Sequence, residues 1–355
     1  MCLKRHGIEP TVLEAGPSVG TSWRRHYRRL HLHTVKEHSS LPGLPFPESA
    51  PRYPSRADVV SYLDAYAARF GIVPRTAEPV RRISLVDGVL TVESDRGAYR
   101  AQAVVVATGL TRVPNPERLP SQETFEGPVI HAEQYRDGGP YTGQRVLVVG
   151  GGNTGAEIAL DVAEHGATPT LSVRTPVNVV PRDFLGIPAQ VTSLRMRSLP
   201  LAMRDRIGRW ASWLTFGDLS RYGLPRPALG PISSVLLRGR IPIIDVGTVD
   251  AIKRGAIAVK AGVARCTARG AIFADGSEER FDAVVTATGY QSALADIVDI
   301  PGVLDARGHP RSWKADRARG LYFVGYDNVA TGLLREIGRQ AEAVAADVFT
   351  MLLPR

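Results

Sequence analysis

Short apolar runs separated by glycine-rich turns mark the middle of the chain. Residues 146–149 are all apolar and predict a buried strand. A turn with four glycines follows at 150–155, and apolar residues at helical spacing across 156–164 predict a helix. Residues 170–173 predict a second strand. Strand, turn, helix and strand in this order predict a parallel βαβ unit with a buried sheet.

The glycines of this unit match the G-x-G-x-x-G pattern of dinucleotide-binding folds. The first glycine permits a tight turn, the second lets the backbone approach a pyrophosphate, and the third lets the helix pack closely on the strand. The amino terminus of the helix then faces the phosphates. The candidate cofactor contacts in this unit are Gly150, Gly152, Asn153, Thr154 and Gly155.

The residue that ends the second strand meets the adenosine ribose and so selects the dinucleotide. Arg174 stands there, and a cation favours the 2′-phosphate of NADP. The alternative is an arginine that merely solvates the end of a strand. Residues 165–170 (His-Gly-Ala-Thr-Pro-Thr) are echoed at 6–11 (His-Gly-Ile-Glu-Pro-Thr). In that copy the strand ends in Glu14, the carboxylate expected for the ribose of FAD or NAD.

The amino-terminal copy has no glycine turn ahead of it. Aligning Gly7 with Gly166 places that turn and its strand before Met1, so about fifteen residues of the motif are expected to be missing. Loss of the strand would expose two strand edges, and loss of the turn would remove donors from the pyrophosphate. A fragment or a misassigned start is therefore expected rather than a natural short form.

A second internal repeat supports the first. Residues 80–109 predict an antiparallel meander with turns at 87–88 and 95–97, and residues 255–289 predict another with a turn at 275–276. Each ends in a valine-rich strand followed by Ala-Thr-Gly, and small residues there let the backbone approach a ligand. The candidate contacts are Ala107, Thr108, Gly109, Ala287, Thr288 and Gly289.

We therefore expect an α/β fold of two nested Rossmann-like dinucleotide-binding domains. Residues 1–118 and 285–355 would form the first domain, truncated at its amino terminus. Residues 119–284 would form an inserted NADP-binding domain with a helical insert near 190–225, and residues 113–116 read as an extended linker. The carboxy-terminal segment, which returns to the first domain, contains a predicted strand at 320–326 and an amphipathic helix. This helix has Leu333, Ile337, Ala341 and Val344 on one face.

Two other stretches predict helices. The first runs from 55 to 70 and opens with Ser55 and Asp58 at the spacing of a capping box. The second, 201–219, combines Trp210 and Trp213 with several arginines and could lie on a membrane surface. The favoured interpretation is a helix that covers a substrate cavity or an interdomain seam.

Composition narrows the class of protein. The 355 residues, 44% of them hydrophobic, suffice for two domains with real cores, and no apolar run reaches the length of a membrane span. No signal peptide is evident, so a cytoplasmic protein is expected. Cys2 and Cys266 form no C-x-x-C pair, and no metal site is expected. The net charge of +9 is spread along the chain, which favours anionic cofactors over nucleic acid.

A motif just before the glycine turn suggests the chemistry. Residues 125–135 fit F-x-G-x-x-x-H-x-x-x-Y and resemble the signature of the flavin-containing monooxygenases. Further segments across nearly the whole chain, including 29–33, 179–182 and 287–290, look like the YUCCA group of that family. The motif residues are Phe125, Gly127, His131 and Tyr135.

The resemblance implies that NADPH reduces FAD and that the reduced flavin captures O2 as a hydroperoxide. FAD and NADP are then the cofactors, and the first domain is the FAD-binding one. The substrates would be O2 and a small molecule, either an indole-3-pyruvate-like 2-oxo acid or a soft nitrogen or sulfur nucleophile. The cofactor carries the reactive group, so the protein mainly positions and protects it. Two alternatives stay open: a non-catalytic NADP-binding protein that has lost FAD, and an NADPH-flavin oxidase that releases peroxide.

The resemblance also implies roles for individual residues. Glu14 would bind the FAD ribose, and Asp327 would approach the ribityl chain. His33 is the candidate catalytic residue, with a structural loop histidine as the alternative. His131 is expected to be a hinge and packing residue, and Arg182 or a basic residue of 204–209 could meet a substrate carboxylate. The residues expected to line the flavin are Ser22, Trp23, His33 and Thr34.

Overall fold

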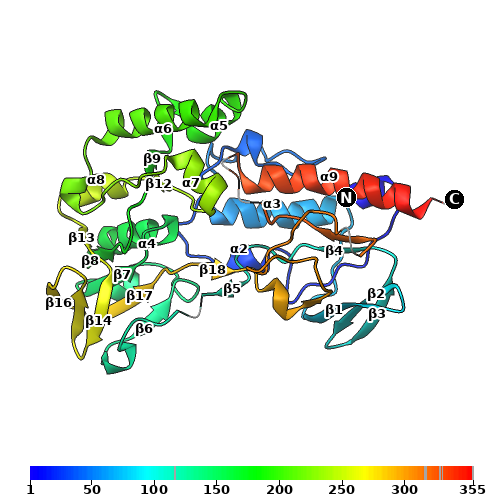
Figure 1. Cartoon of the computed structure of the whole chain (residues 1–355), viewed down its shortest axis with the longest axis horizontal. Helices are drawn as coiled ribbons and strands as arrows, with labels where there is room; N and C mark the ends of the chain where they lie inside the picture. Colours follow the sequence, from blue (N-terminus) through cyan, green and yellow to red (C-terminus); the bar gives the residue numbers. More distant parts are fainter. Residues whose placement is uncertain (116, 316–317, 328, 330, 354–355) are drawn as a thin grey trace.

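The computed structural model describes residues 1–115, 117–315, 318–327, 329 and 331–353. Two α/β halves lie side by side (Figure 1). We call the described residues of 117–289 the inserted half, and those of 1–114 and 290–353 together the enclosing half. Both chain ends lie in the enclosing half, close to helix α9, Leu333–Leu352 (Figure 1).

The inserted half is built on a parallel five-stranded sheet in the order β13-β8-β7-β17-β6. The predicted βαβ unit is present, since the glycine turn joins β7 to α4 and α4 leads to β8. The α4 side chains Ile158 and Val162 are fully buried, because the sheet covers one side of the helix and α8 and β12 pack on the other. The bounds are β6 Val129–His131, β7 Arg145–Val149, α4 Asn153–Glu164, β8 Thr168–Ser172, β12 Ile243–Asp245, α8 Thr248–Lys253, β13 Ala258–Lys260 and β17 Ala283–Thr286.

Further helices and strand pairs lie above α4, on the side away from the main sheet, and α6 forms the outermost layer (Figure 1). The predicted helical insert is therefore present and continues past residue 225 into α7. The predicted meander also forms, as the antiparallel sheet β14-β15-β16. The bounds are β9 Val179–Pro181, β10 Asp183–Phe184, β11 Ile187–Pro188, α5 Ala189–Arg195, α6 Leu201–Phe216, α7 Pro231–Arg238, β14 Val263–Thr267, β15 Gly270–Phe273 and β16 Glu278–Arg280.

The enclosing half contains the other meander, β1-β2-β3, with β19 added beside β1, and the parallel pair β4 and β20. The predicted capping box is confirmed, because Ser55 and Asp58 bond each other's backbone N–H groups at the start of α3. No described helix is long and apolar enough to cross a membrane. The bounds are α1 Cys2–Arg5, α2 Thr21–Arg25, α3 Arg56–Arg69, β1 Val80–Val86, β2 Val89–Ser94, β3 Gly97–Ala101, β4 Val104–Val106, β19 Val298–Asp299 and β20 Leu321–Phe323.

The chain crosses between the halves twice, and the two crossings pair with each other. Strand β5, Val113–Pro114, is antiparallel to β18, Tyr290–Gln291. The linker predicted at 113–116 is thus extended as far as it is described, and residue 116 lies outside the described residues. The expected boundary at 285 falls inside β17, so the return crossing lies at β18.

Candidate coenzyme-binding sites

The glycine turn has the geometry that its three glycines predict. Gly150 has a φ of +144°, and a Cβ there would lie 2.2 Å from the carbonyl oxygen of Ala287. A Cβ on Gly155 would lie 2.0 Å from the carbonyl oxygen of Gly150. A Cβ on Gly152 would meet nothing within 4 Å. The first and third glycines therefore permit close packing, and the second leaves the backbone open to a ligand.

Asn153 and Thr154 begin α4, directly after the turn. The Asn153 side chain donates to the carbonyl of Pro242 at 3.1 Å and accepts from the backbone N–H of Ile244 at 2.7 Å. This side chain fixes β12 against α4. Only the backbone at the start of α4 is therefore available as a phosphate donor from this residue.

The second Ala-Thr-Gly triplet lies beside the glycine turn. The backbone N–H of Ala287 donates to the carbonyl of Val149 at 2.7 Å. The hydroxyl of Thr288 is buried and has no hydrogen-bond partner among the described residues. An orphaned buried hydroxyl costs free energy unless a ligand or water satisfies it. Ala287, Thr288 and Gly289 all line the same cavity as the glycine turn.

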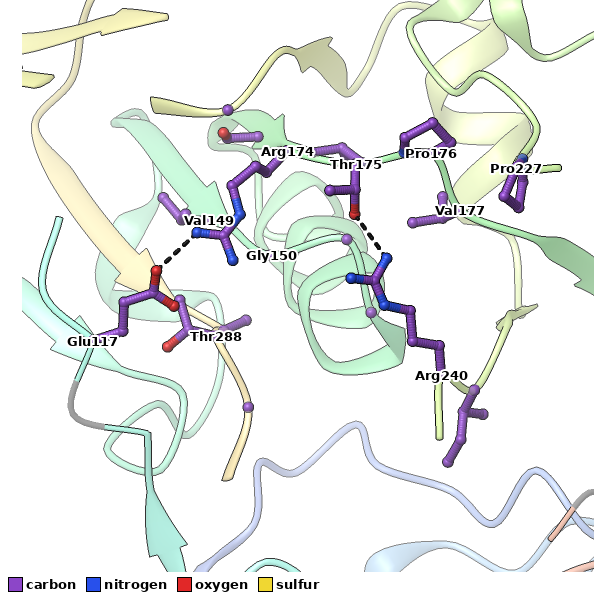
Figure 2. Close-up of a pocket in the computed structure, with 18 of the residues that line it drawn as sticks. Glu117, Val149, Gly150, Arg174, Thr175, Pro176, Val177, Pro227, Arg240 and Thr288 are labelled. Carbon is purple, nitrogen blue, oxygen red and sulfur yellow. Dashed lines mark hydrogen bonds and ion pairs between the residues drawn. The ribbon is translucent and has the colours of Figure 1, made fainter. Parts of the chain in front are cut away.

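That cavity has a volume of about 510 Å³ and is rich in arginine. Figure 2 shows Arg174 and Arg240 on either side of the glycine turn. Arg174 follows β8, as predicted, and its Nη1 lies 2.8 Å from Glu117 Oε1. Arg240 reaches Thr175 Oγ1 at 3.4 Å. Arg118 and Arg238 also line the cavity, so it is suited to an anion.

Sequence reasoning missed Arg240 and Glu117. Arg240 follows α7, and Glu117 follows the crossing strand β5, so neither belongs to the fingerprint. The Arg174 and Glu117 side chains are 74% and 46% exposed, so their ion pair contributes little stability, about 0–1 kcal/mol. A dianionic phosphate can therefore compete with Glu117 for Arg174.

Glu14 is the residue of the enclosing half that corresponds to Arg174 in the sequence repeat. Leu13 bridges to Arg75 in parallel, and the Glu14 carboxylate accepts the backbone N–H of Gly16 at 2.6 Å. Among the described residues no Lys or Arg forms an ion pair with Glu14. The carboxylate therefore fits the hydroxyls of an adenosine ribose.

The residues expected beside the flavin have varied surroundings. Ser22 is exposed on α2, and Trp23 packs against the core of the enclosing half and edge-on to His26 at 5.9 Å between ring centroids. Thr34 Oγ1 lies 2.7 Å from Ser39 Oγ. Gln190 of α5 was not foreseen, and it accepts from the backbone N–H of Val35 at 3.0 Å. It also donates to the carbonyl of Thr331 at 2.7 Å, so one side chain fixes both segments.

His33 contacts the inserted half directly. Its Nε2 lies 2.7 Å from Oε1 of Glu157, a residue of α4 that is 4% exposed. Its Nδ1 is buried without a partner among the described residues. Burial and the Glu157 carboxylate raise the pKa of Tyr27 well above its ordinary value, so this phenol stays protonated. Glu157 was missed because the sequence separates it from His33 by 124 residues.

The motif residues pack the inserted half. Phe125 is buried, and a Cβ on Gly127 would lie 2.6 Å from the carbonyl oxygen of Asp282. The Tyr135 hydroxyl donates to Asp161 Oδ2 of α4 at 2.6 Å. His131 lies edge-on to Tyr290 of the crossing strand, with centroids 5.1 Å apart, and burial lowers its pKa. The hinge and packing role expected of His131 stays a prediction, which its contact with Tyr290 of the crossing strand supports.

The first Ala-Thr-Gly triplet is more open than the second. Ala107 and Thr108 are exposed and Gly109 is half-buried with a φ of +84°. Thr108 Oγ1 lies 2.8 Å from the hydroxyl of Tyr326. Asp327 accepts a hydrogen bond from Gln340 of α9 at 2.6 Å, which leaves its other oxygen available.

Relatives match the chain along most of its length. The protein family described as pyridine nucleotide-disulphide oxidoreductase matches residues 1–183. Indole-3-pyruvate monooxygenase YUCCA1 of Oryza sativa subsp. japonica is 40% identical over 336 residues, 92% of this chain and 82% of that protein. Probable indole-3-pyruvate monooxygenase YUCCA10 of Arabidopsis thaliana is 34% identical over 370 residues, 99% of this chain and 94% of that protein.

Solved structures share the fold. A double mutant of a flavin monooxygenase from Stenotrophomonas maltophilia has a TM-score of 0.76 at 26% identity, over 98% of this chain and 93% of that one. Cyclohexanone-bound cyclohexanone monooxygenase has a TM-score of 0.71 at 21% identity, over 98% of this chain and 83% of that one.

Two nucleotide-type halves, with an arginine-lined cavity over the glycine turn of one, define an oxidoreductase that binds two dinucleotides. Within that class the chain belongs to the flavin-containing monooxygenases, in the group of its YUCCA relatives. It is a monooxygenase that uses FAD and NADPH. The predicted family, fold class and cofactors are confirmed, and the two non-oxygenase alternatives are not favoured.

Proposed function

We propose that the substrate is a small aromatic 2-oxo acid of the indole-3-pyruvate kind. The observation that carries the proposal is 40% identity over 92% of this chain to a protein named indole-3-pyruvate monooxygenase. The 2-oxo acid, O2, NADPH and a proton would give the acid shortened by one carbon, with CO2, water and NADP⁺. One oxygen atom of O2 would enter the new carboxyl group and the other would form water.

The cavity of the inserted half would bind NADPH. The pyrophosphate would lie over Gly152, where the backbone is open, and the start of α4 would face it. Arg174 and Arg240 would hold the 2′-phosphate from two sides. Hydrogen bonds to charged groups contribute about 1.5–3 kcal/mol each, so these two arginines would set the preference for NADPH over NADH.

When bound, FAD accepts the hydride of NADPH and activates O2. In the enclosing half Glu14 would accept hydrogen bonds from the adenosine ribose. His33 would present its unpartnered Nδ1 at the seam between the halves, while Glu157 fixes the orientation of the ring.

Arg182 is our candidate for the substrate carboxylate. Its guanidinium carbon lies 4.1 Å from the centroid of the Tyr53 ring, and its buried Nε makes no hydrogen bond among the described residues and lies 3.6 Å from Asp183 Oδ2. Arg182→Lys keeps the charge but loses the planar fork that binds carboxylates. We expect KM for the 2-oxo acid to rise about tenfold with KM for NADPH unchanged.

The substrate proposal is tested by product analysis. The FAD-loaded protein is supplied with NADPH, ¹⁸O2 and indole-3-pyruvate, and indole-3-acetate is measured by mass spectrometry beside NADPH consumption and peroxide. One labelled oxygen atom per indole-3-acetate, in step with NADPH consumption, supports the proposal. NADPH consumption that yields labelled products only from added amines or sulfides would assign a different substrate to the same enzyme.

A further inference from the structure

The outermost helix, α6, presents large apolar side chains to solvent. Met203, Trp210, Trp213 and Leu214 are each between 48% and 55% exposed. Residues three, four and seven apart lie on one face of a helix, so these four form a single stripe. The two tryptophans therefore face solvent, as the membrane-surface alternative expects, and they do not form the part of this helix that would cover a cavity or an interdomain seam.

The β10–β11 hairpin extends this surface. Leu185 at its tip is 81% exposed and has a φ of +50°, next to Gly186 at +75°. Glycine, asparagine and aspartate adopt such a backbone most readily, and leucine does so at a cost. The tip is placed beside α6, because Phe184 packs edge-on against Trp210 with ring centroids 5.8 Å apart. The apolar patch consists of Leu185, Ile187, Met203, Trp210, Trp213 and Leu214.

The surroundings of the apolar patch are strongly basic. Residues 189–216 contain five arginines and one acidic residue, a net charge of +4. The one acid, Asp205, is used within the fold: Oδ1 accepts the backbone N–H of Ile232 at 2.8 Å, and Oδ2 accepts the hydroxyl of Ser233 at 2.5 Å. At the hairpin, Arg52 donates to the carbonyl of Gly186 at 3.1 Å. Asp205 is thus bonded to residues 232 and 233, and among the described residues it forms no ion pair with the exposed arginines of α6, Arg206 and Arg209.

We propose that the apolar patch docks the protein onto an anionic phospholipid surface. Tryptophan favours the interface between headgroups and acyl chains, and an exposed leucine tip can enter it. Arginine around the patch is attracted to anionic headgroups and keeps its charge in water while its stem packs on apolar surface. A second copy of the chain would instead place basic surface against basic surface, because a twofold interface joins like patches. Charge therefore favours lipid over self-association.

Vesicle binding by the full-length, cofactor-loaded protein tests this. Vesicles of phosphatidylcholine with about 30% phosphatidylglycerol are compared with phosphatidylcholine alone in a flotation assay, at low and high salt. We expect flotation with the anionic vesicles only, weakened by salt, with a blue shift of tryptophan emission. Absence of flotation under all conditions overturns the proposal.

Leu185→Asn is the most informative variant. Asparagine suits the backbone at the tip, so the folded state should be as stable as before or more so. We expect at least a fivefold fall in vesicle affinity with NADPH oxidation unchanged, and a similar fall for Trp213→Ala. Val73→Asn is the matched control, because Val73 is 87% exposed in the enclosing half and lies outside the apolar patch.

Two outcomes contradict the assignment. Equal vesicle binding by Leu185→Asn, Trp213→Ala and Val73→Asn would show that the apolar patch does not carry docking. A sedimentation-measured dimer that Trp213→Ala dissociates would show that the apolar patch joins two copies of the chain instead. Neither outcome depends on the substrate or on the NADPH site.

Discussion

The strands that lead to the two Ala-Thr-Gly triplets differ sharply in their surroundings. Strand β17 lies between β7 and β6, and its Val285 is fully buried. Strand β4 pairs with β20 on one side and with no other described strand, and its Val105 is 37% exposed. The residues before the triplets are Ala-Val-Val-Thr and Ala-Val-Val-Val, so local sequence does not account for the difference.

The neighbouring strand is what differs. Strand β7 supplies the second ladder of β17 and also ends in the glycine turn that packs on Ala287. In the enclosing half the triplet at 107–109 has no such neighbour among the described residues, and Ala107 is exposed where Ala287 is 9% exposed. Strand β7 therefore both buries Val285 and leads into the glycine turn that lines the cavity. The inserted half has its cavity preformed for this reason.

The largest expected contrast is a charge placed at the matched valines. Val285→Asp buries a carboxylate between two strands and should cost at least about 3 kcal/mol in the free energy of unfolding, because no partner compensates it. Val105→Asp should cost less than about 1 kcal/mol, because the side chain already reaches water. Chemical denaturation of both variants measures the difference. Equal losses would mean that β4 is as enclosed as β17.

Two glycines of the turn have different expected roles, Gly155 in packing and Gly152 in ligand contact. Gly155→Ala places a methyl group 2.0 Å from the carbonyl oxygen of Gly150. Overpacking of this kind costs about 1–3 kcal/mol of stability, and NADPH binding should fall with it. Gly152→Ala should leave the melting temperature unchanged and weaken NADPH binding alone, since the added methyl group meets only open space. Thermal melts measure the stability of both variants, and NADPH titrations measure binding. A loss of stability for Gly152→Ala as well as for Gly155→Ala would contradict these two separate roles.

Local patterns predicted the parts of the fold that local physics controls. The glycine turn, the strand before Arg174, the capping box of α3 and both meanders depend on residues close in sequence, and all of them are present, with the strand ending at Ser172. The pairs of Arg174 with Glu117 and of His33 with Glu157 join distant segments, and no short pattern encodes them. The sequence did not decide between an exposed and a covered Trp213, because periodicity identifies a helix face but not what covers it.

The two halves also differ in the charge at the position predicted to meet the ribose, where one has Arg174 and the other Glu14. Arg174→Gln should weaken NADPH binding about 10- to 100-fold, and Arg240→Gln somewhat less, with NADH binding unchanged. Glu117→Gln should strengthen NADPH binding slightly, because it removes the carboxylate that competes for Arg174. Calorimetry measures the binding of 2′,5′-ADP, which carries the 2′-phosphate, and of 5′-AMP, which lacks it, without turnover. A loss for both ligands would place the arginines away from the 2′-phosphate.

The smallest expected contrast concerns two tyrosine–aspartate hydrogen bonds of the same length. Tyr135 donates to Asp161 at 2.6 Å in the inserted half, and Tyr322 donates to Asp347 at 2.6 Å in the enclosing half. The Asp161 side chain is 6% exposed, whereas that of Asp347 is 28% exposed and also binds Lys314. Tyr135→Phe leaves a buried acceptor unsatisfied and should cost about 1–3 kcal/mol, whereas Tyr322→Phe should cost about 0.5–1 kcal/mol.

The pH dependence of stability further distinguishes the Tyr322–Asp347 pair from the Tyr135–Asp161 pair. The hydrogen bonds from Lys314 and Tyr322 hold the pKa of Asp347 below its ordinary value of 3.8. A depressed carboxyl pKa stabilises the fold above the unfolded pKa, and this contribution is lost as pH falls below about 4. Asp347→Asn should therefore lower stability at pH 7 and leave it nearly unchanged near pH 2. Melting curves across this range decide the matter, because a deficit that persists at low pH would assign the effect to lost packing rather than to charge.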